Sequence, residues 1–86
     1  MQEKRKKFQK ALAKIIKSYR ENVSKISITK ASNQIDLTKS VWSSLEAGNR
    51  DPQLSTIWRM AESLNIPLSE IIKKLEQELG IDFFLE

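Results

Sequence analysis

The chain has 86 residues, of which 40% are hydrophobic and 30% charged, and a net charge of +4. This length provides one small hydrophobic core and is too short for two, and the composition is that of a soluble globular domain. The sequence contains no Cys and no His, which excludes a disulfide framework and the side chains most often used to bind zinc or act as a general base. We therefore expect one domain without a metal or other cofactor.

The charges are distributed unevenly along the chain. Residues 1–50 hold twelve Lys or Arg and four Asp or Glu, whereas residues 51–86 hold three and seven. This asymmetry predicts a basic side that meets an anionic partner, although basic surface charge can also serve solubility alone. No apolar run has the length of a membrane span, and the first residues lack the apolar segment of a signal peptide, so we expect no membrane contact and a cytoplasmic location.

A first helix is predicted from the apolar side chains that recur at helical spacing from residue 8 to residue 19 and form a buried stripe. The nearly all-polar residues 1–7 are expected to fray at their start. Four lysines form a second stripe on roughly the opposite side, which is either a solvated face or, for one or two of them, a contact with an anionic partner. The apolar stripe comprises Phe8, Leu12, Ile15, Ile16 and Tyr19, and the lysine stripe comprises Lys7, Lys10, Lys14 and Lys17.

Two short helices joined by a tight turn are predicted over residues 27–47. Ser27 and Thr38 are good N-caps, because a hydroxyl can accept a hydrogen bond from a first-turn amide. Asp36 suits the turn between the helices, since its short side chain tolerates left-handed geometry. Apolar stripes then bury one side of each helix: Ile28, Ala31 and Ile35 in the first, and Val41, Trp42 and Leu45 in the second.

The second of these helices, at about residues 39–47, exposes a slim polar face once its apolar stripe is buried. Gly48 is a typical C-cap for it, and Pro52 is suited to open the next helix. The face is either a neutral exposed surface or one that inserts into a binding partner, and we favour insertion. It consists of Lys39, Ser40, Ser43 and Ser44.

Two more helices follow Pro52, separated by a turn at residues 65–67. Pro67 or Ser69 opens the last helix, and Gly80 is a natural end for it. The stripe of the fourth helix comprises Leu54, Ile57, Ala61 and Leu64, with Trp58 and Met60 at its edges, and that of the fifth comprises Leu68, Ile71, Ile72, Leu75 and Leu79.

The tail that follows is too apolar to extend freely into water. It either folds back onto the core of the same chain or packs on a second subunit, and we favour the subunit contact because one small core leaves little surface to cover. Its apolar residues are Ile81, Phe83, Phe84 and Leu85.

The order of residues across this region resembles the helix-turn-helix of phage repressors and Cro proteins, the Xre-type regulators. The resemblance extends over about residues 8–75; each match is weak alone, and the ordered set is specific. The matching residues are Tyr19-Arg20 at the end of the first helix, Ser27, Ser32, Asp36 at the turn glycine, Leu37-Thr38, Trp42, Leu45-Glu46-Ala47-Gly48 at the signature before a polar loop, Asn49 to Pro52, and the stretch MAESLNIPLSEI at residues 60–71.

This resemblance implies an all-α, five-helix bundle of the lambda-repressor-like type that forms a single domain over residues 1–86. It implies a sequence-specific regulator of transcription from a bacterium or phage that binds double-stranded DNA, with residues 39–47 as the recognition helix. Lys39, Ser40 and Ser44 match the positions that reach bases, with Ser43 beside them. Phosphate contacts match Thr38, the Ile28 amide, Asn49, Arg50, Ser55 and Thr56.

The resemblance also places Arg20 against Glu46, as a forked ion pair that braces the recognition helix against the first helix. The alternative is an exposed arginine of little energetic value. The loop at residues 22–25 is one residue longer than is usual in the family.

Three positions depart from the family pattern: Ala31 stands where leucine is usual, Asp36 where glycine is usual, and Ile28 where glutamine often helps to hold a phosphate. We hypothesise that the Trp42 indole fills the volume that Ala31 leaves, because empty core volume is costly.

A domain of this size touches few base pairs, so we expect a repressor that acts as a homodimer on a near-palindromic operator. Lacking a second domain for an inducer, the chain is similar to small stand-alone regulators. A protein-interaction module with little DNA binding, antitoxin-like or a subunit of a complex, is the alternative. An enzyme acting on a small molecule is disfavoured, because the carboxylates are scattered and no phosphate loop or base–nucleophile set is evident. The candidate interface for either partner comprises Trp58, Leu79, Phe83, Phe84 and Leu85.

Overall fold

The computed structural model describes residues 2–85, which form five α-helices, one π-helical turn and no strand. The predicted all-α, five-helix fold is confirmed. Met1 and Glu86, the ends of the predicted domain, lie outside the described residues. The elements in chain order are α1 (Gln2–Ser18), the π-helical turn η1 (Tyr19–Ser24), α2 (Ile28–Gln34), α3 (Lys39–Glu46), α4 (Leu54–Ser63) and α5 (Leu68–Leu79).

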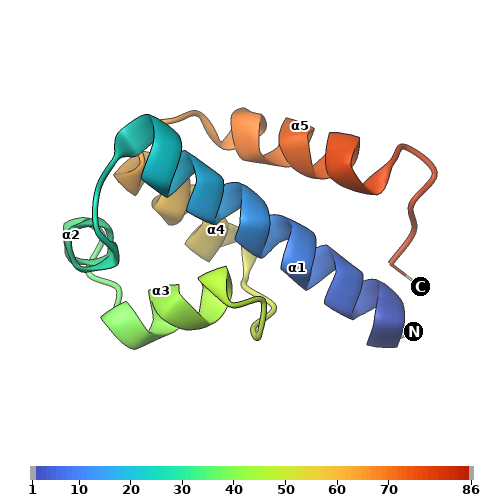
Figure 1. Ribbon diagram of the computed structural model, residues 1–86, viewed down its shortest axis with the longest axis horizontal. Helices are drawn as coiled ribbons and strands as arrows, with labels where there is room; N and C mark the ends of the chain where they lie inside the picture. Colours follow the sequence, from blue (N-terminus) through green and yellow to red (C-terminus); the bar gives the residue numbers. More distant parts are fainter. Residues whose placement is uncertain (1, 86) are drawn as a thin grey trace.

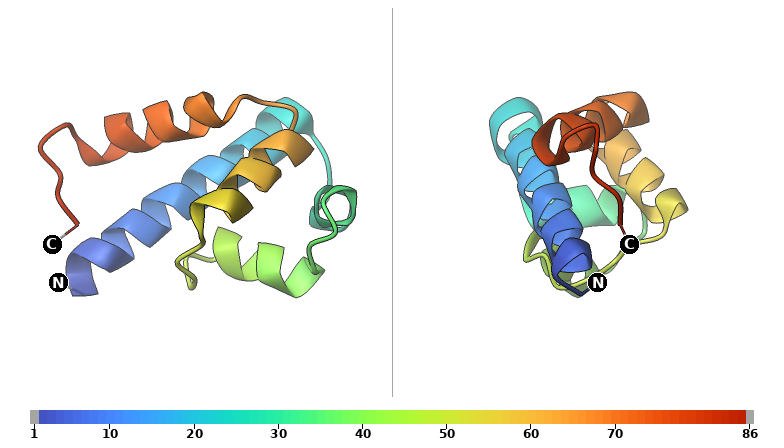
Figure 2. Two further views of the ribbon diagram at one scale, coloured as in Figure 1. Left: turned by 180° about the vertical axis from the view of Figure 1, so that it is seen from behind. Right: turned by 90° about the vertical axis from the view of Figure 1, so that its right-hand side faces the viewer.

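The long helix α1 runs through the middle of the molecule, with α5 along one side and α3 on the other (Figure 1). The views from behind and from the side show the same order (Figure 2). The tail after α5 returns to the N-terminal part of α1, away from α2 (Figures 1 and 2). Regular helix reaches back to Gln2, further than expected for residues that fray. The short helices α2 and α3 are therefore on the side of α1 opposite to α5 and the tail.

One hydrophobic core joins all five helices. The helices begin and end near the predicted residues, and most predicted stripes are buried. Leu54 is an exception: it is 58% exposed, because it lies in the first turn of α4, beyond the end of the core. Met60, predicted at an edge, is fully buried, since its spacing from Ile57, Ala61 and Leu64 places it on the same face. The largest buried side chains are Trp42, Ile16, Met60, Leu64 and Ile71.

The segment at residues 22–25, predicted as a loop, is helical as far as Ser24 and belongs to the π-helical turn η1. A π-helical turn contains more residues than an α-helical turn, and such turns are rare. The carbonyl of Arg20 accepts hydrogen bonds from the amides of both Lys25 and Ile26, and Lys25 closes the turn in the left-handed region at φ 55°. This turn thus extends the first helix to Ser24 and leaves residues 25–27 before the start of α2.

Tyr19, the first residue of η1, attaches this turn to α5. Its phenol donates a hydrogen bond to Glu70 Oε2 at 3.1 Å. Burial, and then the bond to the Glu70 carboxylate, raise the pKa of Tyr19 above its usual value of 10.0, because both disfavour the phenolate.

We expect the phenolate absorbance of Tyr19, the single tyrosine in the chain, to appear above pH 10.0 in the folded protein. The pKa of Tyr19 is higher in the folded than in the unfolded state, so the stability from its neutral form is complete below pH 10 and declines as the pH rises through the folded pKa. In an ultraviolet titration, Glu70→Gln should lower the midpoint, and Glu76→Gln, which changes another exposed carboxylate of α5, should leave it unchanged. Equal midpoints in wild type and Glu70→Gln would contradict the assignment.

Candidate nucleic-acid interface

The two short helices begin at the predicted caps. Ser27 Oγ accepts a hydrogen bond from the Lys30 amide at 3.1 Å, and Thr38 Oγ1 accepts one from the Val41 amide at 3.3 Å. Asp36 adopts φ 58° in the turn between them, the left-handed geometry predicted for it. The local sequence therefore fixes where α2 ends and α3 starts.

The exit from α3 differs in one respect from the prediction. Gly48 follows the helix at φ 75°, as a glycine C-cap requires. Pro52, however, does not open α4: that helix begins at Leu54, because Gln53 has extended backbone angles and is its N-cap. Four exposed or partly exposed residues, 49–52, thus link Gly48 to the N-cap of α4.

Hydrogen bonds from α4 hold α2 in place. Ser63 Oγ donates to the carbonyl of Ala31 at 2.6 Å, and the Arg59 guanidinium donates to the carbonyl of Ile35 at the end of α2. These contacts were not predicted from sequence, because their acceptors are backbone carbonyls, which leave no side-chain pattern. Ala31 is fully buried, so this small side chain allows α4 to approach the backbone of α2.

A forked ion pair joins the end of the first helix to α3. Arg20 Nε lies 2.5 Å from Glu46 Oε2, and Arg20 Nη2 lies 3.0 Å from Oε1. Arg20 Nη1 also donates to the carbonyl of Ile26 at 2.9 Å. Only 10% of the Arg20 side chain and 6% of the Glu46 side chain are exposed, so this is a buried pair rather than a surface one. The hydrogen bond to Glu46 is the main cause that raises the pKa of Arg20, and the arginine stays charged.

Trp42 completes this network. Its indole Nε1 donates to Glu46 Oε2 at 2.6 Å, one turn further along α3. The four-residue spacing on one helix is a signal that could have predicted this contact. The indole is fully buried in the same core cluster as Ala31, as the hypothesis of volume compensation requires. Glu46 thus accepts from Arg20 and Trp42 together.

The opposite side of α3 faces solvent. Lys39 and Ser40 are exposed, whereas Ser43 and Ser44 are partly exposed, so the polar face narrows toward the end of the helix. Ser40 Oγ lies 3.4 Å from Thr38 Oγ1. Among the described residues, no hydrogen-bond partner is found for the side chains of Lys39, Ser43 and Ser44. These groups remain available to an external ligand.

The residues predicted to contact phosphate lie at helix starts and in the segment after α3. Ile28 and Thr38 are at the N-terminal ends of α2 and α3, and the Thr38 hydroxyl is already used as a cap. Of the others, Asn49, Arg50 and Ser55 are exposed and Thr56 is partly exposed.

The apolar residues predicted for a subunit contact are divided between two grooves along α5. Trp58 is 54% exposed and lies beside Leu68 and Ile72, whereas Phe84 is 72% exposed in a groove with Phe8 at the other end of α5. The remaining members, Leu79, Phe83 and Leu85, line this second groove. The tail lies beside the N-terminal part of α1 and leaves α3 uncovered (Figure 2).

These features define a helix-turn-helix DNA-binding regulator. The sequence model of the Cro/C1-type helix-turn-helix family matches residues 16–71, more than half of the chain, and the chain belongs to that family. Comparisons with curated proteins and with solved structures gave no match. None of the described helices combines the length and the apolar character needed to cross a membrane.

We expect Arg20→Ala to lower the free energy of unfolding by about 3 kcal/mol, because it leaves the buried Glu46 carboxylate without its countercharge. Chemical denaturation measures this loss. Arg50→Ala removes the same charge from an exposed site and should change stability by at most about 0.5 kcal/mol. Equal, small losses for both variants would show that the ion pair does not brace α3.

Proposed function

We propose that this protein is a homodimeric transcriptional repressor that inserts α3 into the major groove of a near-palindromic operator. The observation that supports this most strongly is that the two opposite sides of α3 have different environments. One side is fixed to the core through Glu46 and Trp42, and the other presents unpartnered polar side chains to solvent. A short helix presented in this way fits the width of the major groove.

Base reading is assigned to the exposed face of α3. Lys39 can donate to guanine O6 and N7, whereas Ser40, Ser43 and Ser44 can donate or accept and so tolerate several bases. Because Ser43 and Ser44 are only partly exposed, we expect most contacts with bases to come from the N-terminal end of α3. We expect one sharply preferred base pair near Lys39 and weaker preferences at its neighbours.

Phosphate contacts fix the position of this helix on the duplex. Asn49, Arg50 and Ser55 are exposed and polar, and Thr56 is partly exposed beside them in the chain. The Ile28 amide and Thr38 add donors at the starts of α2 and α3. Such contacts carry no sequence information, but they supply affinity that falls as salt is raised.

Two copies are needed for useful specificity, and the apolar grooves along α5 are the proposed contact between them. A two-fold dimer places its recognition helices about 34 Å apart, one turn of the DNA helix. The exposed Trp58 and Phe84 also suit a different protein partner, which is the second candidate function. A site of action in the cytoplasm, on the bacterial or phage nucleoid, follows from the proposed role.

Selection from randomised duplexes tests the proposal. We expect enriched sequences with two related half-sites whose centres are one helical turn, or a multiple of it, apart. A reporter promoter carrying that sequence should be expressed less when the protein is present. Enrichment of no duplex, together with a stable complex with another protein, would replace the repressor by the interaction module.

We expect Lys39→Ala to relax preference at one base pair, with a loss of about 1–3 kcal/mol in discrimination and an unchanged fold. Ser44→Ala should alter preference less. Both are measured by repeating the selection and checking the fold by circular dichroism, with the exposed Lys74→Ala on α5 and Ser18→Ala on α1 as matched controls. Uniform weakening on all sequences would assign Lys39 and Ser44 to the DNA backbone instead of to the bases.

A further inference from the structure

Several positive charges of the first helix lie where they destabilise the helix itself. α1 contains seven Lys or Arg and one Glu, and four of those cations, residues 4–7, lie near its N-terminal end. Positive charge near a helix N-terminus opposes the helix dipole, and like charges four residues apart repel each other. Cations that disfavour the helix that contains them indicate an anionic partner outside the chain.

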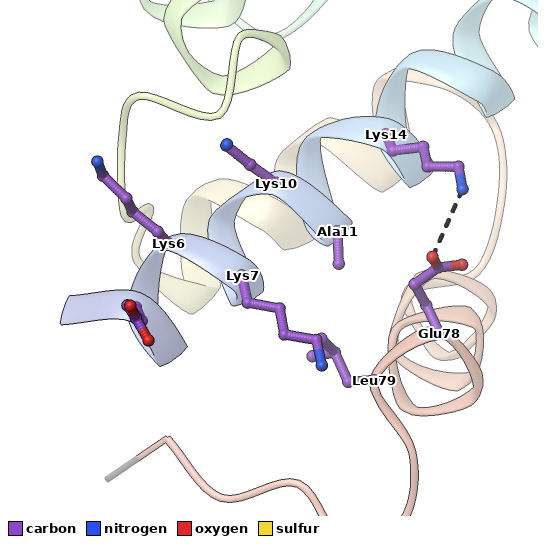
Figure 3. Close-up of a pocket in the computed structure, with 8 residues that line it drawn as sticks. Lys6, Lys7, Lys10, Ala11, Lys14, Glu78 and Leu79 are labelled. Atoms are coloured by element: carbon purple, nitrogen blue, oxygen red, sulfur yellow. Dashed lines mark hydrogen bonds and ion pairs between the residues drawn. The ribbon is translucent and has the colours of Figure 1, made fainter. Parts of the chain in front are cut away.

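The structure divides the lysines of this helix between two sides. Lys14 Nζ lies 3.4 Å from Glu78 Oε2 of α5, and Lys7 Nζ lies 5.9 Å from the centre of an aromatic ring of the tail. Among the described residues, no ion-pair partner is found for Lys6 or Lys10. Figure 3 shows both of these side chains pointing away from α5, toward the segment that follows α3.

That segment is attached to α1 at two points. Arg5 and Asp51 form an ion pair between them. A Cβ added to Gly48 would lie 3.3 Å from Lys10 Cγ and 3.4 Å from its Cα, so the backbone passes directly against α1. Arg50 is exposed and lies between these two attachment points. It is therefore placed beside the unpaired lysines of the first helix.

We infer that Lys6, Lys10 and Arg50 form one cationic edge, which contacts the phosphates of the DNA backbone next to α3. The N-terminal end of α1 and the segment after α3 lie on the same side of the molecule as α3, opposite to α5 (Figure 1). The inference rests on the proposed function and adds a contact from a part of the chain that precedes the matched family region, residues 16–71. It also distinguishes Lys6 and Lys10 from the lysines that face α5.

The test compares two double variants that remove the same charge from opposite sides of α1. Lys6→Gln/Lys10→Gln alters the proposed edge, and Lys7→Gln/Lys14→Gln alters the side facing α5. Each is titrated at several salt concentrations against a duplex enriched by selection with the wild-type protein. Because each phosphate contact contributes about 0.9 to the slope of log Kobs against log[salt], the loss of two contacts in each subunit of the first variant should make the slope less negative by about 2 per bound subunit, and by about 4 for the proposed dimer. The base preference of this variant should remain that of the wild type.

The second double variant should keep the wild-type slope, and Lys6→Arg/Lys10→Arg should keep it as well, because the charge is retained. Thermal unfolding of each variant shows that the fold is intact. Equal changes of slope in both double variants, or no change in either, would overturn the assignment of Lys6 and Lys10. The selection with the wild-type protein separately tests the proposed function, because enrichment of no duplex counts against that function itself. An unchanged slope in the variants overturns only the assignment of Lys6 and Lys10.

Discussion

The position of the recognition helix depends on one buried carboxylate. Glu46 accepts hydrogen bonds from the guanidinium of Arg20 and from the indole of Trp42, and it is almost inaccessible to water. A buried ion pair is not in itself strong evidence for stability, because desolvation offsets much of its attraction. Its forked geometry is directional, however, and it fixes the rotation of an eight-residue helix that would be marginal alone. We attribute to this network the outward orientation of the polar face of α3.

The π-helical turn at the end of α1 is part of the same arrangement. Arg20 lies within it, and its carbonyl accepts two backbone hydrogen bonds while its side chain reaches Glu46 and the carbonyl of Ile26. Lys25 ends this turn in the left-handed region, and the Arg20 guanidinium meets α3 at Glu46. At its other end, α1 is long enough for its N-terminal half to reach the segment that carries Arg50.

Sequence alone predicted the features that depend on local chemistry. The caps at Ser27 and Thr38, the left-handed Asp36 and the burial of Trp42 follow from side-chain properties and helical spacing, and the partnership of Arg20 with Glu46 came from the family resemblance. The bonds from Ser63 and Arg59 to carbonyls of α2 could not be predicted, because a backbone acceptor has no sequence signature. The directions in which the lysines of α1 point could not be predicted either, because they depend on how α5 and the segment after α3 pack around that helix.

An amide-resolved NMR titration of the protein with its selected duplex tests the role of α3 most directly. We predict that the signals that shift first come from the start of α2, from α3 and from residues 48–51, while those beside Ile72 on α5 change little at constant oligomeric state. Shifts confined to α5 and the tail, with α3 unaffected, would contradict the assignment of α3 as the surface that reads DNA.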